Sequence, residues 1–208
     1  MRYNIYVKTE IFFITYYKKY KIMSSLKFTN ESLRERINNE YYDNIENWDV
    51  SEVTDMSELF KNSYNFNYDI SEWNVSNVTN MNSMFSGCWK FDQDIGNWNV
   101  GKVKNMYGMF YECFKFDKYI GNWNVSNVTD MISMFLECNN FNQNIGNWDV
   151  RNVTNMSGMF GGCIKFNQDI GNWDVRNVTE MYDMFWNCVN FNQDIGNWNV
   201  TNVINMGH

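Results

Sequence analysis

The sequence contains no proline and no alanine, and its only histidine, His208, is the last residue. The lack of proline and alanine is typical of an AT-rich genome, because the codons of both residues are GC-rich. A single terminal histidine removes histidine from the candidates for acid–base or nucleophilic catalysis. Cationic residues are also few, with 17 Lys and Arg against 24 Asp and Glu and a net charge of −7. An acidic chain binds phosphates poorly, so we expect no nucleic-acid partner.

The chain also lacks a long hydrophobic run, although hydrophobic residues make up 44% of it and aromatic residues 18%. The apolar stretch at residues 11–17 is too short to span a bilayer, so we expect no membrane span. As a signal peptide it is weak, since the basic residues mostly follow it and no small-x-small cleavage site appears. We therefore expect an intracellular or virion-associated protein rather than a secreted one, with Met23 as an alternative start.

Tryptophan recurs with a fixed period of 25 residues. The tryptophans of this series are Trp48, Trp73, Trp98, Trp123, Trp148, Trp173 and Trp198. No insertion or deletion breaks the spacing, and such a period is typical of solenoid proteins, in which each repeat stacks on the one before. Phe, Ile, Val, Met and Cys residues recur with the same period, which indicates the core of such a stack.

Two local patterns alternate within each repeat. Met81, Met84, Phe85 and Cys88 have the i, i+3, i+4, i+7 spacing of one face of a short helix. Residues 91–95 alternate apolar and polar side chains as a strand does, and the glycine that follows them predicts a bend with positive φ. The predicted fold is an α/β repeat solenoid of about seven coils, each with a short parallel strand and a short helix.

The segment before the first repeat predicts a cap. Residues 29–43 have the N-cap and capping-box residues of a helix, and Leu33, Ile37 and Tyr41 lie on one face of it. A solenoid needs such a cap, because its first coil would otherwise expose apolar core to water. The predicted organisation is an N-terminal extension at residues 1–28, a capping helix with its connecting segment at 29–47 and the repeat solenoid at 48–208.

The repeat resembles a known family. From Trp73 to Cys88 the chain reads W-N-V-S-N-V-T-N-M-N-S-M-F-S-G-C. This unit is similar to the repeat of a domain first noted in mycoplasma surface proteins, which itself resembles the BspA-like leucine-rich repeats of bacterial surface antigens. Such proteins occur in bacteria, protists and large DNA viruses. The resemblance covers about residues 30–208. It implies a right-handed, leucine-rich-repeat-like solenoid that attaches to surfaces or binds protein, without enzyme activity.

Three repeated columns have both a chemical and a structural interpretation. The cysteines point the same way in successive coils and do not converge, so we expect a buried ladder of free thiols rather than a metal site or disulfides. The column of Asp94 suggests calcium, but calcium-binding solenoids use a nonapeptide period, and we expect a polar ladder. Asn77 and its equivalents form Asn-Val-Thr sequons, which we interpret as side chains that bond loop backbone rather than as glycosylation sites. We expect no metal and no cofactor.

Positions that vary between repeats are the candidate binding site. Aromatic side chains at such positions are favoured as anchors of protein interfaces. The candidate binding residues are Trp89, Tyr107, Tyr111, Phe114, Tyr182 and Trp186. The alternative is that these side chains pack locally over the turns of their own repeats.

No catalytic constellation is present, because every candidate group recurs as a column whereas an active site is singular. We therefore predict that the protein is not an enzyme and acts as a scaffold that binds another protein. The alternative is a structural, self-associating surface or virion component. Its support is the last repeat, which stops at His208 before a Met-Phe pair and offers an end for an end-to-end homodimer.

Overall fold

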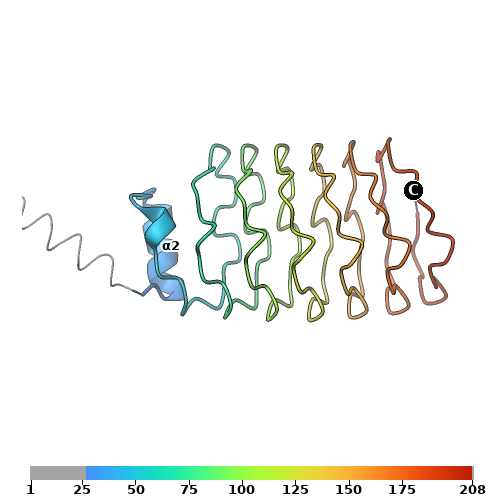
Figure 1. Cartoon of the computed structure of the whole chain (residues 1–208), viewed down its shortest axis with the longest axis horizontal. Helices are drawn as coiled ribbons and strands as arrows, with labels where there is room; N and C mark the ends of the chain where they lie inside the picture. The colour runs from blue at the N-terminus through green and yellow to red at the C-terminus, as the bar shows by residue number, and fades with distance from the viewer. Residues whose placement is uncertain (1–26, 208) are drawn as a thin grey trace, which may run out of the picture.

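A computed structural model describes residues 27–207 and shows the chain wound into a stack of similar turns along one long axis (Figure 1). Each turn, here called a coil, takes up one 25-residue repeat, so equivalent residues of neighbouring repeats lie side by side. Helix α2 lies at one end of the stack and the last coil at the other (Figure 1). The expectations for residues 1–26 and for His208 fall outside the described residues.

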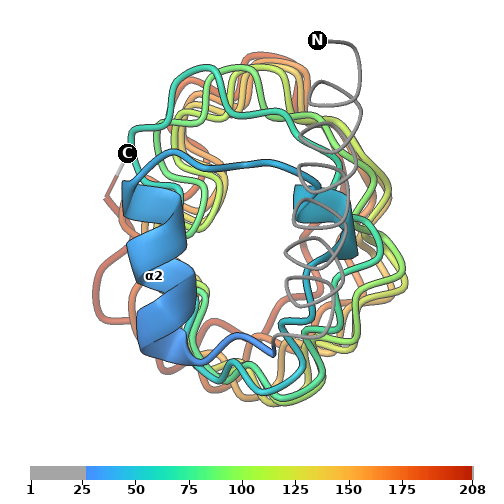
Figure 2. The same ribbon diagram turned by 90° about the vertical axis from the view of Figure 1, so that its left-hand side faces the viewer.

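Helix α2, Asn30–Asn38, lies over one side of the first coil, and the chain that follows it crosses to the other side (Figure 2). Thr29 is its N-cap, and the side chains of Thr29 and Ser32 each accept a hydrogen bond from the other's backbone N–H in a capping box. Leu33 on its inner face is fully buried. A short 3-10 helix, η1 (Ile45–Asn47), then leads into the repeats.

The helix predicted over residues 29–43 ends early. Asn39 donates its side-chain amide to the carbonyl oxygen of Glu35 at 2.8 Å, and Glu40 has a φ of 55°, which a right-handed helix does not allow. Tyr41, which was predicted on the buried face, is 58% exposed as a result.

The prediction of an α/β solenoid with a strand and a helix in every coil is wrong. Within residues 27–207 the helices are α2 and η1, and both precede the repeats. Strand pairing in the same part of the chain is reduced to isolated parallel bridges. Those between coils join Asp55 to Asn80, Asn80 to Asn105, Asn105 to Asp130, Asp130 to Asn155, Asn155 to Glu180 and Glu180 to Asn205. The coils are built from consecutive turns.

The segment predicted as a helix has an alternating hydrogen-bond pattern that no helix has. The backbone N–H groups of Met106, Gly108 and Phe110 donate to carbonyl oxygens of the next coil at 3.0, 2.8 and 2.9 Å. Between them, Met109 donates to Met106 at 3.2 Å and Tyr111 donates to Gly108 at 3.1 Å, both within the same coil. One set of amides therefore closes tight turns, and the other set holds neighbouring coils together.

Left-handed backbone at two positions of each repeat explains why the helical spacing misled. Gly108 and Glu112 have φ angles of 53° and 56°, outside the helical region. The same two positions are left-handed in six coils, at Glu58, Asn62, Ser83, Gly87, Gly108, Glu112, Ser133, Glu137, Gly158, Gly162, Asp183 and Asn187. This path returns the Met, Phe and Cys side chains to the interior with the spacing that a helix would also give. Recurrent glycine at these positions is the sequence signal against a helix.

The segment predicted as a strand pairs through side chains in place of a backbone ladder. The N–H of Asn142 donates to the Asp117 carboxylate at 2.9 Å, and the N–H of Asn167 donates to the Asn142 side-chain oxygen at 2.9 Å. Gln168 adds a bond from its amide to the Asn142 carbonyl oxygen at 2.9 Å. Side-chain oxygens thus accept the bonds that carbonyl groups accept in a parallel sheet, and the alternating pattern does not produce a strand.

The glycine that was predicted to have positive φ serves close packing instead. Its column, from Gly96 to Gly196, contains none of the left-handed glycines. A Cβ placed on Gly146 would lie 2.5 Å from the carbonyl oxygen of Asp169 in the next coil. At Gly196 the nearest such atom is a side-chain oxygen of Asp194, at 3.1 Å. Glycine is therefore required by the approach of the following coil.

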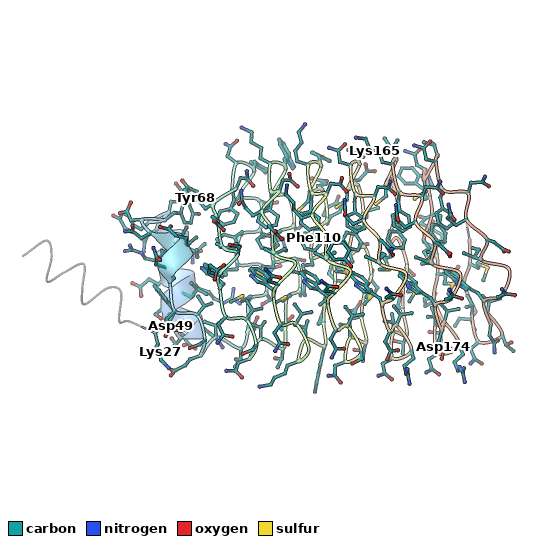
Figure 3. The ribbon with its side chains drawn as sticks, viewed as in Figure 1. Lys27, Asp49, Tyr68, Phe110, Lys165 and Asp174 are labelled. Atoms are coloured by element: carbon teal, nitrogen blue, oxygen red, sulfur yellow. The ribbon has the colours of Figure 1, made fainter. Side chains whose placement is uncertain are left out.

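Side chains of the repeated apolar columns fill the interior of the stack (Figure 3). The rings of Phe110 and Phe135 lie 5.6 Å apart and 5° from parallel, and Phe116 of the second phenylalanine column lies 4.2 Å from Phe110. The rings of Trp123 and Trp148 lie 6.5 Å apart and 1° from parallel. The prediction that the tryptophan and Met-Phe columns form the core is confirmed.

Candidate functional site

The tryptophan column is hydrogen-bonded as well as stacked. The indole N–H of Trp123 donates to the carbonyl oxygen of Ile95 in the preceding coil at 3.1 Å, and Trp148 donates to Ile120 at the same distance. The equivalent bond exists at every tryptophan of the series from 73 to 198. Since a buried indole needs such a partner, the polar atom of this column is already used by the scaffold.

The five cysteines form a ladder of thiol donors. The Sγ atom of Cys138 lies 2.8 Å from the carbonyl oxygen of Phe110 in the preceding coil, and the other four make the same contact. Burial raises the pKa of Cys88 and Cys188 to about 12, and it raises the pKa of the three interior thiols well above the ordinary value. Nucleophilic and metal-binding cysteines act as thiolates, so these protonated thiols serve packing and hydrogen bonding.

The asparagine and aspartate columns are bound into the scaffold too. The amide of Asn77 donates to the carbonyl oxygen of Ser51 at 2.8 Å, and the equivalent asparagines at 127, 152, 177 and 202 repeat this bond. The Asp169 carboxylate accepts the N–H of Gly171 at 3.0 Å. Within residues 27–207, no three His, Cys, Asp or Glu side chains gather closely enough to hold a metal ion. The asparagine column is the structural ladder that the sequence indicated, whereas Asp169 and its equivalents bond to the backbone of their own turn.

A two-residue corner between the cysteine column and the second phenylalanine column carries exposed side chains. In a central coil the N–H of Phe116 donates to the carbonyl oxygen of Cys113 at 3.1 Å, which closes the corner and leaves Phe114 half-buried and Lys115 exposed. We call the first corner residues the corner ridge: Tyr64, Trp89, Phe114, Asn139, Ile164 and Val189. The second corner residues form the lysine row: Asn65, Lys90, Lys115, Asn140, Lys165 and Asn190.

The corner ridge is continuous over three coils and lies on one edge of the stack. The rings of Tyr64 and Trp89 are 4.3 Å apart, and those of Trp89 and Phe114 are 5.8 Å apart. Trp89 remains 42% exposed despite these contacts. Figure 3 shows Lys165 of the lysine row on the same edge and Asp174 on the opposite edge. An apolar surface therefore runs along one side of an acidic protein.

The six predicted binding residues fall into three columns of the repeat. Trp89 and Phe114 are neighbours in the corner ridge and contact each other. The other four belong to two other repeat positions, and the two members of each pair lie three coils apart: Tyr107 with Tyr182, and Tyr111 with Trp186. The other exposed apolar members of the ridge, Tyr64, Ile164 and Val189, were not among the predicted binding residues. Their shared repeat position was the signal that could have found them.

Charge is unevenly placed beside the ridge. Glu112 accepts the indole N–H of Trp89 at 3.4 Å, and its hydrogen bond with the Tyr111 hydroxyl raises the pKa of that tyrosine. On the other side, the three lysines of the lysine row form no ion pair with any of residues 27–207. Arginines of the repeats differ, since Arg151 pairs with Asp149 at 2.7 Å. The lysine row therefore holds uncompensated positive charge.

The outer face of the last coil is a second exposed apolar surface. It contains a hollow of about 300 Å³, which is lined by Met181, Met184, Phe185, Ile195, Gly196, Trp198, Val200 and Met206. Val200 is 38% exposed and Met206 is 54% exposed, whereas their equivalents in inner coils are buried. The hollow is thus the interior of the stack seen from its last described coil.

A comparison with protein families gives a match to the repeats. The family model described as "Mycoplasma protein of unknown function, DUF285" matches residues 29–131 and, in a second copy, residues 115–208. Neither the curated proteins nor the solved structures contain a match. None of the helices formed by residues 27–207 has the length and hydropathy of a membrane-spanning segment.

Proposed function

We propose that this chain, which belongs to the family described as Mycoplasma protein of unknown function, DUF285, is a non-catalytic scaffold that holds another protein along its corner ridge. The observation that carries the proposal is the ridge itself, where five of six positions have an apolar or aromatic side chain at an outward corner. Exposed apolar patches of this kind mark interaction sites. Most other repeated apolar columns are buried inside the stack.

The absence of catalysis is part of the proposal. The groups with reactive chemistry recur in successive coils and are hydrogen-bonded there, as Cys138 is to the carbonyl oxygen of Phe110. An active site is a singular arrangement, and ladders of equivalent groups do not supply one. Burial also keeps the thiols protonated, which removes the most nucleophilic side chain from consideration.

A crosslinking experiment tests the scaffold role. A photoreactive phenylalanine analogue replaces Trp89 in one protein and Tyr119, which is 46% exposed outside the ridge, in a matched control. After irradiation in host lysate, we expect a defined protein to be crosslinked at position 89 and absent at position 119. Capture of the same proteins at both positions would contradict binding along the ridge.

A second candidate function is self-association through the hollow of the last coil. The supporting observation is its apolar lining, with Trp198 and Val200 accessible in this chain. Unpaired edges of a repeat stack template the addition of another chain. We expect a concentration-dependent dimer in sedimentation velocity if this role is correct.

Two substitutions in the last coil distinguish self-association through the hollow from non-specific association. Val200→Glu places a charge in the hollow, whereas Ile204→Glu places one at a residue that is 81% exposed and outside the lining. The dimer should be lost with Val200→Glu and kept with Ile204→Glu. A monomer at all concentrations for the unchanged chain would rule out the structural role.

A further inference from the structure

We propose that the corner ridge and the lysine row together form one binding strip for an extended acidic polypeptide segment, in which apolar residues alternate with Asp or Glu. This inference rests on the proposed scaffold function and names the chemistry of its partner. Four observations carry it: the fold does not need these residues, their charge is opposite to that of the repeats, their spacing admits a short extended chain, and the surrounding charge disfavours nucleic acid.

The corner folds without apolar or cationic residues. In one coil the two corner residues are Asn139 and Asn140, and the turn still closes with the N–H of Phe141 donating to the carbonyl oxygen of Cys138 at 3.0 Å. The equivalent bond in the coil with Phe114 is 3.1 Å long. Since the same hydrogen bond closes both corners, the turn itself does not require the aromatic and lysine residues of the other corners.

The charge of the strip is opposite to that of its surroundings. From Trp48 onward the chain has 9 Lys and Arg against 18 Asp and Glu, a net charge of −9. The corner ridge and lysine row contain three lysines and no acidic residue. Lys90, Lys115 and Lys165 are exposed and have no ion-pair partner among the described residues. Such a strip is complementary to carboxylates.

The spacing of the strip admits a short extended chain that lies along the stack. Successive ridge rings are 4.3 Å apart between Tyr64 and Trp89 and 5.8 Å apart between Trp89 and Phe114. An extended chain places side chains on one face about every 6.7 Å, longer than both ring distances, so over the three coils of the continuous ridge such a chain drifts by about one residue relative to the rings. A segment over the boundary between the two columns turns its apolar face to the ridge and its acidic face to the lysine row.

A nucleic acid is a poorer match for the same surface. The Glu112 carboxylate lies against the Trp89 indole at 3.4 Å, and a phosphate chain stacked on these rings would pass beside it. The net charge of −7 opposes binding of a polyanion at long range, whereas a short segment has only a few carboxylates and can place them beside the lysine row and its apolar side chains beside Glu112.

Fluorescence anisotropy with a synthetic peptide tests the proposal. The probe is a fluorescein-labelled peptide of alternating leucine and glutamate, about twelve residues long, which reaches about 40 Å when extended and so covers the whole strip. A leucine–lysine peptide of the same length and a labelled oligothymidine are the two comparison probes. Binding to the unchanged chain is measured at two ionic strengths, and we expect the leucine–glutamate peptide to bind most tightly and to weaken with salt.

Two pairs of charge reversals separate the strip from general electrostatics. Lys90→Glu/Lys115→Glu alters the lysine row, and Lys102→Glu/Lys104→Glu changes the net charge equally at exposed positions elsewhere in the repeat. We expect at least a tenfold loss of peptide affinity for the first pair and less than a twofold loss for the second. Equal losses, tighter binding of oligothymidine or no binding of the leucine–glutamate peptide would overturn the proposal. Circular dichroism melts check that both pairs fold.

The crosslinking experiment distinguishes failure of this inference from failure of the scaffold role. If the crosslink at position 89 persists in the Lys90→Glu/Lys115→Glu background, the ridge binds a protein but the acidic segment is wrong. If no crosslink specific to position 89 forms with the unchanged chain, the scaffold function itself fails.

Discussion

A central coil and the last described coil contain the same residue types but differ in what covers them. Met131 is fully buried, and its equivalent Met206 is 54% exposed. Val125 is 1% exposed, and its equivalent Val200 is 38% exposed. The repeat alone therefore does not determine burial. Burial comes from the following coil, and the stability of any residue in the stack depends on whether a neighbour lies on both sides of it.

The N-terminal end shows how such a surface is covered. Leu33 and Ile37 of α2 are 0% and 4% exposed and take the place of a preceding coil against the first core residues. Arg34 of the helix also reaches the carbonyl oxygen of Ser57 at 2.6 Å. One end of the stack is thus sealed by a helix of a different sequence, while the other presents repeat residues.

The largest expected effect is the loss of stability when a tryptophan is truncated, and it should differ between the central and the last coil. Trp123→Ala removes a ring that is 3% exposed and stacked within the core, and we expect it to lower the free energy of unfolding by about 3–5 kcal/mol. Trp198→Ala removes a half-buried ring with a neighbour on one side, at Trp173, and should cost roughly half as much. Urea titration measures both. Equal losses would break the comparison.

A second contrast uses glycines with different neighbours. In Gly146→Ala the new methyl group would lie 2.5 Å from the Asp169 carbonyl oxygen, so the next coil must shift, at a cost of about 1–3 kcal/mol. Gly196→Ala meets only a side-chain oxygen at 3.1 Å, and the change should stay within ~0.5 kcal/mol. Thermal melts of the two variants give the difference. An equal or larger loss at 196 would contradict selection of glycine by the close approach of the next coil.

Alkaline pH provides a third contrast, through the buried thiols. Burial raises the pKa of Cys188 to about 12 and that of Cys138 well above normal, whereas an unfolded thiol titrates near ~8.5. The folded chain then keeps protons that the unfolded chain releases. The free energy of unfolding is therefore highest below the unfolded pKa and falls as the pH rises toward the folded values.

Serine substitutions check the origin of that pH dependence. Cys138→Ser keeps a hydrogen-bond donor for the carbonyl oxygen of Phe110 but removes one titrating thiol, so stability should fall less steeply with pH. Cys188→Ser should also make the free energy of unfolding fall less steeply with pH, and this difference from the unchanged chain should end at about pH 12. If the free energy of unfolding falls as steeply with pH in both variants as in the unchanged chain, tyrosines or lysines control alkaline unfolding.

The smallest expected effect is in amide hydrogen exchange. Backbone amides of residues 197–205 should exchange faster than those of residues 122–130, because less of the surrounding structure must open to release them. If the last coil also self-associates, its exchange should slow as protein concentration rises while the central coil stays constant. Equal protection of both segments at low concentration would contradict the difference in neighbour contacts.

The sequence predicted those features that depend on side-chain identity alone. A period of 25 residues located the core columns, and the asparagine and cysteine columns were correctly interpreted as ladders. The backbone path was not predictable in the same way. A run of turns with left-handed residues at Gly108 and Glu112 returns side chains inward at the same spacing as a helix. Hydrogen bonds to the next coil favour the run of turns over the helix. A single repeat does not contain the partners of those bonds.

The candidate site was predicted only in part for a related reason. Trp89 and Phe114 were found as unusual aromatic residues, one repeat at a time. The ridge is a property of a column, in which Tyr64, Ile164 and Val189 belong to the same surface. No single repeat reveals this column, and the polar Asn139 interrupts its apolar character. Asn139 also shows that the corner tolerates a polar residue.

The alternation of tight turns with bonds to the next coil also has a kinetic consequence. The indole of Trp148 reaches Ile120, 28 residues earlier, and the other contacts between coils join residues at similar separations. Closing a loop of this length costs about 3 kcal/mol beyond a constant, and the cost is the same for each coil. Folding can then begin at any adjacent pair of coils, and each further coil is added onto a template that already exists. The rate should therefore be set by the first pair, and a chain with more repeats should fold no more slowly than this one.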